Sequence, residues 1–176
     1  SKSGRWLICP QPRPEAKLQL FCFPYAGGSA SAFKLWADAL TEDIELCVIQ
    51  MPGREERLGE KLITDMSILV DTLAKEITTF SDRPFAFFGH SMGAIVAYET
   101  ALRLRYIEAS QPVHLFLSSR AAPHMQDKSS PLRFLDDATF IDSLHRTYGA
   151  VPEVIRQSED LKKVFLPILR ADVELL

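Results

Sequence analysis

The sequence has no long apolar run. Its 176 residues are 47% hydrophobic, yet no run approaches the roughly 18 residues that a membrane-spanning helix needs. The apolar stretch at residues 6–10, behind five mixed residues, is also too short for a signal peptide. We therefore expect one soluble globular domain over residues 1–176 and no membrane association.

Cysteine and positive charge are also sparse. The cysteines Cys9, Cys22 and Cys47 form an odd set, and two of them lie inside apolar runs, where a free thiol packs as a small hydrophobic group. This predicts a cytoplasmic protein with no metal site. The net charge is −3 and the Lys and Arg residues are scattered, which argues against nucleic acid as a partner.

What the sequence contains is an alternation of strands and helices. Apolar runs at 18–23, 45–50, 85–88 and 113–119 predict buried strands. Between them, apolar residues within 64–80 recur at helical spacing, and Ser31 is a candidate cap for another helix. The pattern predicts an α/β fold, with a mostly parallel sheet, helices on both faces, and a binding crevice at the carboxyl ends of the strands.

After Pro131 the pattern becomes helical. Two amphipathic segments follow, with apolar faces formed by Phe140, Ile141, Leu144 and Tyr148 and by Leu161, Val164, Phe165 and Ile168. We expect the core of the domain to occupy about 1–128 and these helices, over about 130–176, to form a lid over the crevice. The alternative is that they simply pack on the sheet.

The segment FAFFGHSMGA at 85–94 has the pattern of a nucleophile elbow. An apolar strand precedes Ser91 and an alanine-rich helix follows it, so strand and helix meet at this serine. The flanking Gly89 and Gly93 let the two backbones approach while the serine takes a strained conformation, with His90 and Met92 between. We predict Ser91 as the nucleophile. The alternative is a glycine-rich turn that binds an anion at a helix N-terminus.

A serine nucleophile also needs N–H donors for the developing oxyanion. One donor is expected from Met92, directly after the nucleophile, and the other from the loop after the 18–23 strand. In that loop Ala26 precedes Gly27 and Gly28, and small residues leave the backbone open to a substrate oxygen. We predict Ala26 and Met92 as the oxyanion-hole residues, although residues 24–28 are also compatible with a plain strand-exit turn.

Five motifs in order carry a further signal along nearly the whole chain. They are FPYAGG at 23–28, PGREER at 52–57, FAFFGHSMG at 85–93, HLFLSSRAAP at 114–123 and LRAD at 169–172. Together they resemble the type II thioesterases, stand-alone α/β-hydrolases of fatty acid, polyketide and nonribosomal peptide synthesis. The resemblance implies Ser91 as nucleophile, Met92 and Ala26 as oxyanion-hole amides, and a mobile lid from about residue 130.

The sequence departs from this family at its C-terminal end. The family's triad adds an Asp and a His from later strands, in G-x-x-D-like and G-x-H-F-like segments, and neither segment is present. We therefore expect the C-terminal strands and both triad partners to be lacking from this chain. The four histidines are poor substitutes for the base: His90 adjoins the nucleophile, and the others are His114, His124 and His145.

The resemblance implies hydrolysis of acyl thioesters on the phosphopantetheine arms of acyl or peptidyl carrier proteins. The reaction would pass through a Ser91 acyl-enzyme in a monomer, with no metal or diffusible cofactor. Two alternatives stay open: an esterase or amidase for small acyl substrates, and a noncatalytic carrier-binding fragment. The region of Arg54, Arg57 and Lys61 is a candidate surface for an acidic carrier protein, or a solvated face of mixed charge.

Overall fold

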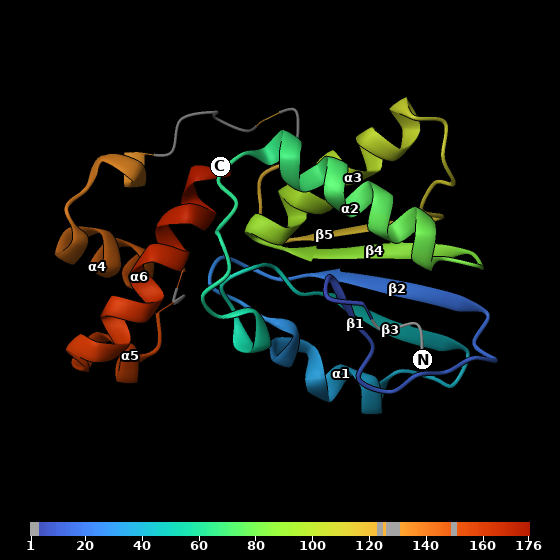
Figure 1. The fold of residues 1–176 in the computed structure, drawn as a ribbon, viewed down its shortest axis with the longest axis horizontal. Coiled ribbons are helices and arrows are strands. Elements are labelled where there is room, and N and C mark those ends of the chain that lie inside the picture. Colours follow the sequence, from blue (N-terminus) through green and yellow to red (C-terminus); the bar gives the residue numbers. More distant parts are fainter. Residues whose placement is uncertain (1–3, 123–124, 126–130, 149–150) are drawn as a thin grey trace.

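The structure is a computed structural model that describes residues 4–122, 125, 131–148 and 151–176. In this part of the chain a five-stranded sheet has the order β1-β3-β2-β4-β5 (Figure 1). The strands are β1 (Leu7–Ile8), β2 (Leu18–Phe23), β3 (Ile44–Ile49), β4 (Phe85–His90) and β5 (Leu115–Ser118). Strands β2 to β5 run parallel, and β1 pairs antiparallel with β3. The four predicted strands are confirmed, whereas β1 was missed because two residues are too few to show a pattern.

Helices cover both faces of this sheet. Those of the first two thirds of the chain are α1 (Lys34–Ala39), α2 (Met66–Phe80) and α3 (Met92–Tyr106). Figure 1 shows α2 and α3 on one face and α1 on the other. Along β2, Phe21 and Phe23 belong to the apolar cluster shared with α2 and α3, while Leu20 and Cys22 belong to the cluster shared with α1. The alternation shows a strand buried on both sides.

The two predicted N-terminal helices had different outcomes. Helix α2 is confirmed, and its cap is Asp65, whose carboxylate accepts the N–H groups of Ser67 at 2.8 Å and Ile68 at 3.2 Å. The predicted cap at Ser31 is wrong. Ser31 lies inside a 3₁₀ turn at Ala30–Phe33, its hydroxyl is 3.0 Å from that of Ser29, and α1 begins only at Lys34.

The chain from Pro131 onward forms the C-terminal helices, which are α4 (Asp137–Tyr148), α5 (Glu153–Gln157) and α6 (Glu159–Glu174), preceded by a 3₁₀ turn at Pro131–Phe134. Their apolar faces form a cluster of their own that includes Phe140, Leu144 and Leu169. Figure 1 shows these helices beside the sheet, beyond the end where β4 leads into α3. These helices thus bury apolar residues against one another, and directly after α6 Leu175 joins the core cluster of the sheet. Whether they act as a lid stays a prediction.

Strand β5 is an edge strand that exposes apolar side chains. Phe116 is 50% exposed, and its neighbours Leu115 and Leu117 are more than a third exposed. Parallel strands are ordinarily covered on both faces, so this edge is unusual. Among the described residues, no helix combines the length and apolar character that crossing a membrane requires.

Candidate functional site

Ser91 lies at the turn between β4 and α3. Its backbone has φ 54° and ψ −115°, a conformation that costs a residue other than glycine about 1–3 kcal/mol. The surrounding structure enforces it: the Ser91 N–H donates to the carbonyl of Ser118 on β5 at 2.9 Å, and the Ser91 carbonyl accepts from the Ala94 N–H at 3.1 Å. The hydroxyl does not cap α3, and no described residue forms a hydrogen bond with it. The Ser91 side chain is half-buried, and no hydrogen bond within the described structure occupies its oxygen.

The two glycines of the elbow have no room for a side chain. A Cβ on Gly89 would stand 2.7 Å from the Cα of Ala94, and a Cβ on Gly93 would stand 2.7 Å from the carbonyl oxygen of Pro24 and still closer to that of Phe23. Real Cβ atoms do not approach backbone so closely. Gly89 thus lets α3 start against β4, and Gly93 lets α3 start against the end of β2.

The loop after β2 is a four-residue turn next to this elbow. The N–H of Gly28 donates to the carbonyl of Tyr25 at 2.8 Å, and Gly27, at the third position, has φ 76°. The N–H of Gly27 donates to the carboxylate of Asp172 at 2.7 Å. Tyr25 and Ala26 donate their N–H groups to no other described residue, and Ala26 packs against the cluster that contains Met92.

Met92 is the first residue of α3 and is buried. A first helical residue has no carbonyl within its own helix to receive its N–H. The two predicted oxyanion donors, the N–H groups of Met92 and Ala26, therefore have no hydrogen-bond acceptor among the described residues. The N–H groups of Ser91 and Gly27 are already bound to Ser118 and Asp172.

None of the described histidines forms a hydrogen bond with the Ser91 hydroxyl. The Nδ1 atom of His90 lies 3.2 Å from the Ser118 hydroxyl, and its ring meets the Tyr25 ring edge to face at 6.1 Å. His114 stacks on Phe116 at the exposed edge of the sheet. His145, on α4, is 3.0 Å from the carbonyl of Val151. The fourth, His124, lies outside the described residues.

The prediction of a basic surface formed by Arg54, Arg57 and Lys61 is wrong for the two arginines. Arg54 and Arg57 are each only 5% exposed, so neither offers its charge to a protein surface or to solvent. Arg57 donates to the Gln50 carbonyl at 2.6 Å and pairs with Glu60. Of the three basic residues Lys61 is the exposed one, and Glu55 and Glu56 are exposed as well, which leaves a face of mixed charge. Sequence alone shows mixed charge in this segment, and only the folded chain shows which charges are internal.

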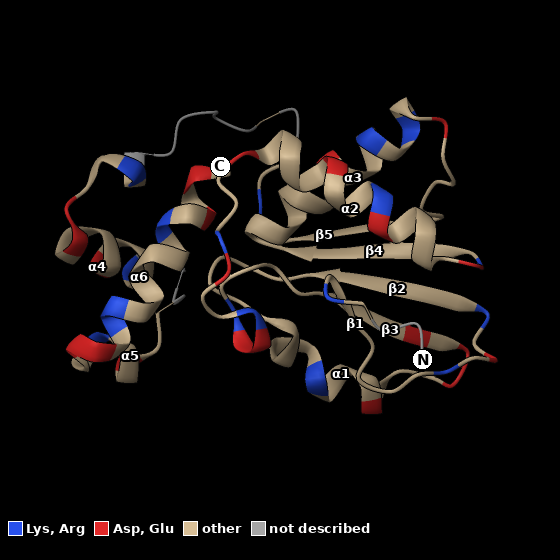
Figure 2. Ribbon diagram, viewed as in Figure 1, with Lys and Arg blue, Asp and Glu red and all other residues tan. Residues whose placement is uncertain are grey.

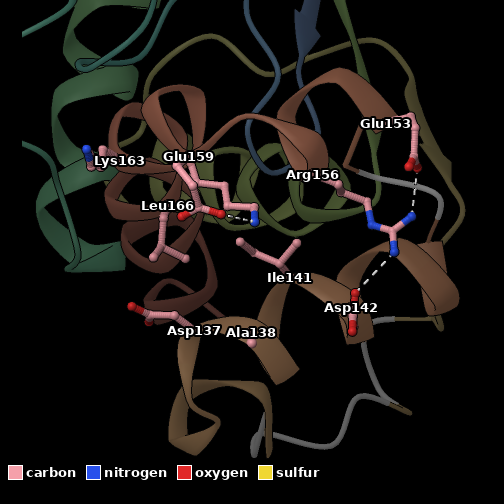
Figure 3. Close-up of a pocket in the computed structure, with 10 residues that line it drawn as sticks. Asp137, Ala138, Ile141, Asp142, Glu153, Arg156, Glu159, Lys163 and Leu166 are labelled. Carbon is pink, nitrogen blue, oxygen red and sulfur yellow. Dashed lines mark hydrogen bonds and ion pairs between the residues drawn. The ribbon is translucent and has the colours of Figure 1, made fainter.

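A surface pocket of about 540 Å³ lies within the C-terminal helices, away from the elbow (Figure 3). Arg156 on its wall pairs with Glu153 and Asp142, and Lys162 pairs with Glu159. Figure 2 shows the same interspersion of acidic and basic residues along α5 and α6. Ser91 is not among the residues that line this pocket, so the pocket is not the candidate active site. No cluster of three or more potential metal ligands occurs among the described residues.

The parallel sheet flanked by helices and the strained serine between β4 and α3 define an α/β-hydrolase. Comparison with known proteins narrows this class, since residues 18–176 match the thioesterase domain family. The chain belongs to that family.

Three relatives illustrate the match. The gramicidin S biosynthesis protein GrsT of Aneurinibacillus migulanus is 41% identical over 98% of this chain and 67% of its own length. The medium-chain S-acyl fatty acid synthase thioesterase of Homo sapiens is 35% identical over 96% of this chain and 64% of its own. The structure of YbtT, a type II thioesterase of the yersiniabactin NRPS/PKS pathway, superimposes with a TM-score of 0.82 at 35% identity, covering 96% of this chain and 68% of YbtT. The chain thus spans about two thirds of the length of these relatives.

Proposed function

We propose that the protein hydrolyses acyl thioesters carried on the phosphopantetheine arm of a carrier protein, with Ser91 as the nucleophile. The observation that carries this proposal is the Ser91 hydroxyl, which stands on a strained backbone turn and is bound by no described residue. Membership of the thioesterase family supports the thioester as substrate. Relatives named for fatty acid synthase and for NRPS/PKS pathways support the carrier protein as the donor of the acyl group.

In the proposed reaction, the Ser91 oxygen attacks the thioester carbonyl and its proton passes to a base. The N–H groups of Met92 and Ala26 stabilise the tetrahedral oxyanion, and the thiol of the arm leaves with a proton. Water then attacks the acyl-enzyme ester, which releases the acid and restores the serine. The two amides are suited to this role because the turns around them leave both without a described partner.

The base and its acid belong, in this proposal, to a part of the protein outside residues 1–176. Two observations support this. The relatives are longer than this chain by about half, and β5 exposes Phe116 and its neighbours at the sheet edge, where further strands and the helices that connect them would cover the edge and these side chains. We infer that 1–176 supplies the nucleophile, the oxyanion hole and the C-terminal helices as a lid, within one hydrolase domain.

We also propose that the protein is located in the cytoplasm. Cys9 and Cys47 place their sulfur atoms 3.0 Å apart and are both free thiols, as is Cys22. Three free thiols in a chain of this size fit a reducing compartment such as the cytoplasm.

The test is turnover of an acylated carrier protein by the full-length protein, compared with turnover of a simple aryl ester. We expect faster release from the carrier protein, and at least about a 1000-fold loss of kcat in S91A. A fluorophosphonate probe should label the wild-type protein at Ser91 and leave S91A unlabelled.

The matched control is S67A, which removes an exposed serine from the first turn of α2 and should change neither rate nor labelling. Faster turnover of the aryl ester would instead favour a small-ester esterase. Full activity in S91A would refute the proposed mechanism.

A further inference from the structure

Two charged residues from motifs far apart in the sequence form an ion pair next to the 25–28 turn. Arg54 follows β3 and Asp172 lies near the end of α6, 118 residues later, and their side chains form a buried ion pair. Arg54 is 5% exposed and Asp172 is fully buried. The reaction proposed above uses neither of them, so their place in the structure needs another explanation.

The guanidinium of Arg54 connects three segments at once. Its Nε donates to the carbonyl of Gly28 at 3.1 Å, one terminal nitrogen donates to the carbonyl of Pro52 at 2.8 Å, and the other binds Asp172. A planar fork with fixed donor directions is suited to such a junction, whereas an ammonium group is not. Arg54 thereby ties the 25–28 turn to the loop after β3 and to α6.

Asp172 binds the same turn directly. The carboxylate oxygen that binds Arg54 also accepts the N–H of Gly27 at 2.7 Å. The Gly27 peptide and the peptide that carries the Ala26 N–H belong to one turn, which the Gly28 N–H closes onto the Tyr25 carbonyl, so holding the first helps to hold the second. The α6 side chain of Leu169 also lies against Gly27, where a Cβ would stand only 2.7 Å from it.

Stability alone does not account for this ion pair. Buried pairs gain little net free energy over apolar residues of similar size, because both charges lose their hydration. Burial raises the pKa of the Asp172 carboxyl, while the Arg54 guanidinium and the Gly27 N–H oppose that rise. The second carboxylate oxygen is buried and has no hydrogen-bond partner among the described residues. Of the three backbone groups that the pair binds, the Gly28 carbonyl and the Gly27 N–H belong to the turn, and the third is the carbonyl of Pro52.

We propose that Arg54 and Asp172 are positioning residues that hold the 25–28 turn so that the Ala26 N–H faces the oxyanion formed at Ser91. This inference rests on the proposed function and adds a role for the PGREER and LRAD segments. It also makes α6 part of the support of the oxyanion hole, because Asp172 belongs to that helix.

The test uses the full-length protein and compares wild type with the double variant R54M/D172L. This variant leaves no unpaired buried charge, so we expect it to fold, with a lower Tm because the carbonyls of Gly28 and Pro52 and the N–H of Gly27 each lose a partner. Misplacing one oxyanion donor should lower kcat about 10- to 100-fold, with KM within about twofold, because that hydrogen bond acts mainly in the transition state. Hydrogen exchange at the Gly27 amide should become faster in the same variant.

A conservative variant separates the hydrogen bonds from the charge. In D172N the side-chain oxygen still accepts from Gly27 and Arg54, and the amide nitrogen takes the place of the unpartnered oxygen. We expect kcat of D172N to lie closer to wild type than to the double variant. A kcat as low as that of R54M/D172L would overturn the positioning role.

The matched control is R13M. Arg13 also donates to several backbone carbonyls, including those of Ala37 and Ile44, but lies at the opposite end of β3. We expect R13M to lower Tm without changing kcat or the rate of hydrogen exchange at the Gly27 amide. Wild-type kcat in a folded R54M/D172L, alongside an inactive S91A, would refute the positioning role and leave the proposed function intact. An active S91A would refute the proposed function instead.

Discussion

Gly93 lies where the elbow leaves no space for any side chain, which makes it the sharpest single-residue test of the site. In G93A the new methyl would meet the carbonyl oxygens of Phe23 and Pro24, which belong to rigid backbone. We expect a loss of about 3 kcal/mol in unfolding free energy and a loss of fluorophosphonate labelling at Ser91, since α3 must move away from β2. Urea denaturation and intact-protein mass spectrometry measure the two effects.

Gly59 provides the control for this substitution. It has φ 87°, but a Cβ there meets nothing within 4 Å, so G59A carries only the backbone penalty of about 1–2 kcal/mol. Labelling of Ser91 should be unaffected. If G93A were as stable as the wild type, α3 could not lie as close to β2 as the structure places it.

Among the secondary-structure elements, α2 depends on its cap. Hydrogen bonds from the Ser67 hydroxyl and from the Ser67 and Ile68 N–H groups lower the pKa of Asp65. A lowered carboxyl pKa stabilises the fold above the unfolded-state pKa, and that contribution disappears as the pH falls through the folded-state value. We expect D65A to lower Tm by about 2–4 °C at pH 7, and the difference in urea stability from wild type to shrink as the pH falls below about 3.9.

D65N separates capping from charge. Asn caps a helix about as well as Asp and does not titrate, so D65N should keep most of the stability at pH 7. Its stability relative to D65A should not change through the acid range. A difference between wild type and D65A that is constant with pH would show that Asp65 does not cap α2 as a carboxylate.

For the whole molecule, the exposed edge at β5 tests the proposal that the domain continues beyond residue 176. In F116K of the full-length protein, covering strands would bury the new charge, and we expect a loss of about 3–5 kcal/mol in unfolding free energy. In the separate segment 1–176, Phe116 is half exposed and the same change should stay within about 0.5 kcal/mol. Urea denaturation of both forms measures the contrast.

I68K is the matched control, because Ile68 lies on the outer side of α2 and is 57% exposed. It should have a small effect in both forms. If F116K were equally harmless in the full-length protein, nothing would cover β5, and the proposed continuation of the sheet would fail.

Structural features formed by residues that are contiguous in the chain could be predicted from the sequence. The strand at Leu18–Phe23 and the helix at Met66–Phe80 follow from unbroken apolar runs and from helical spacing. The elbow follows from an apolar strand, two glycines and an alanine-rich helix within ten residues. The α/β class followed from the alternation of these elements, because alternating strands and helices pack as a parallel sheet between helical layers.

Features made by residues far apart could not be predicted in this way. Ser31 looks like a helix cap in the sequence, yet its own N–H donates to the Glu55 carboxylate at 3.4 Å and the helix begins later. Arg57 looks like a surface charge, yet it is buried above the Trp6 ring at 4.2 Å. In both cases a partner from another segment decides between two locally reasonable structures.

For the candidate site, the amino-acid order was sufficient to single out Ser91 and the small residues that make room for it, because steric limits on a tight turn act between neighbours in the chain. The fold alone decided which N–H groups near Ser91 remain without a partner and brought Asp172 against Arg54 and Gly27. Hydrogen bonds and the burial of charge depend on which segments meet in space, and that is a property of the packed molecule.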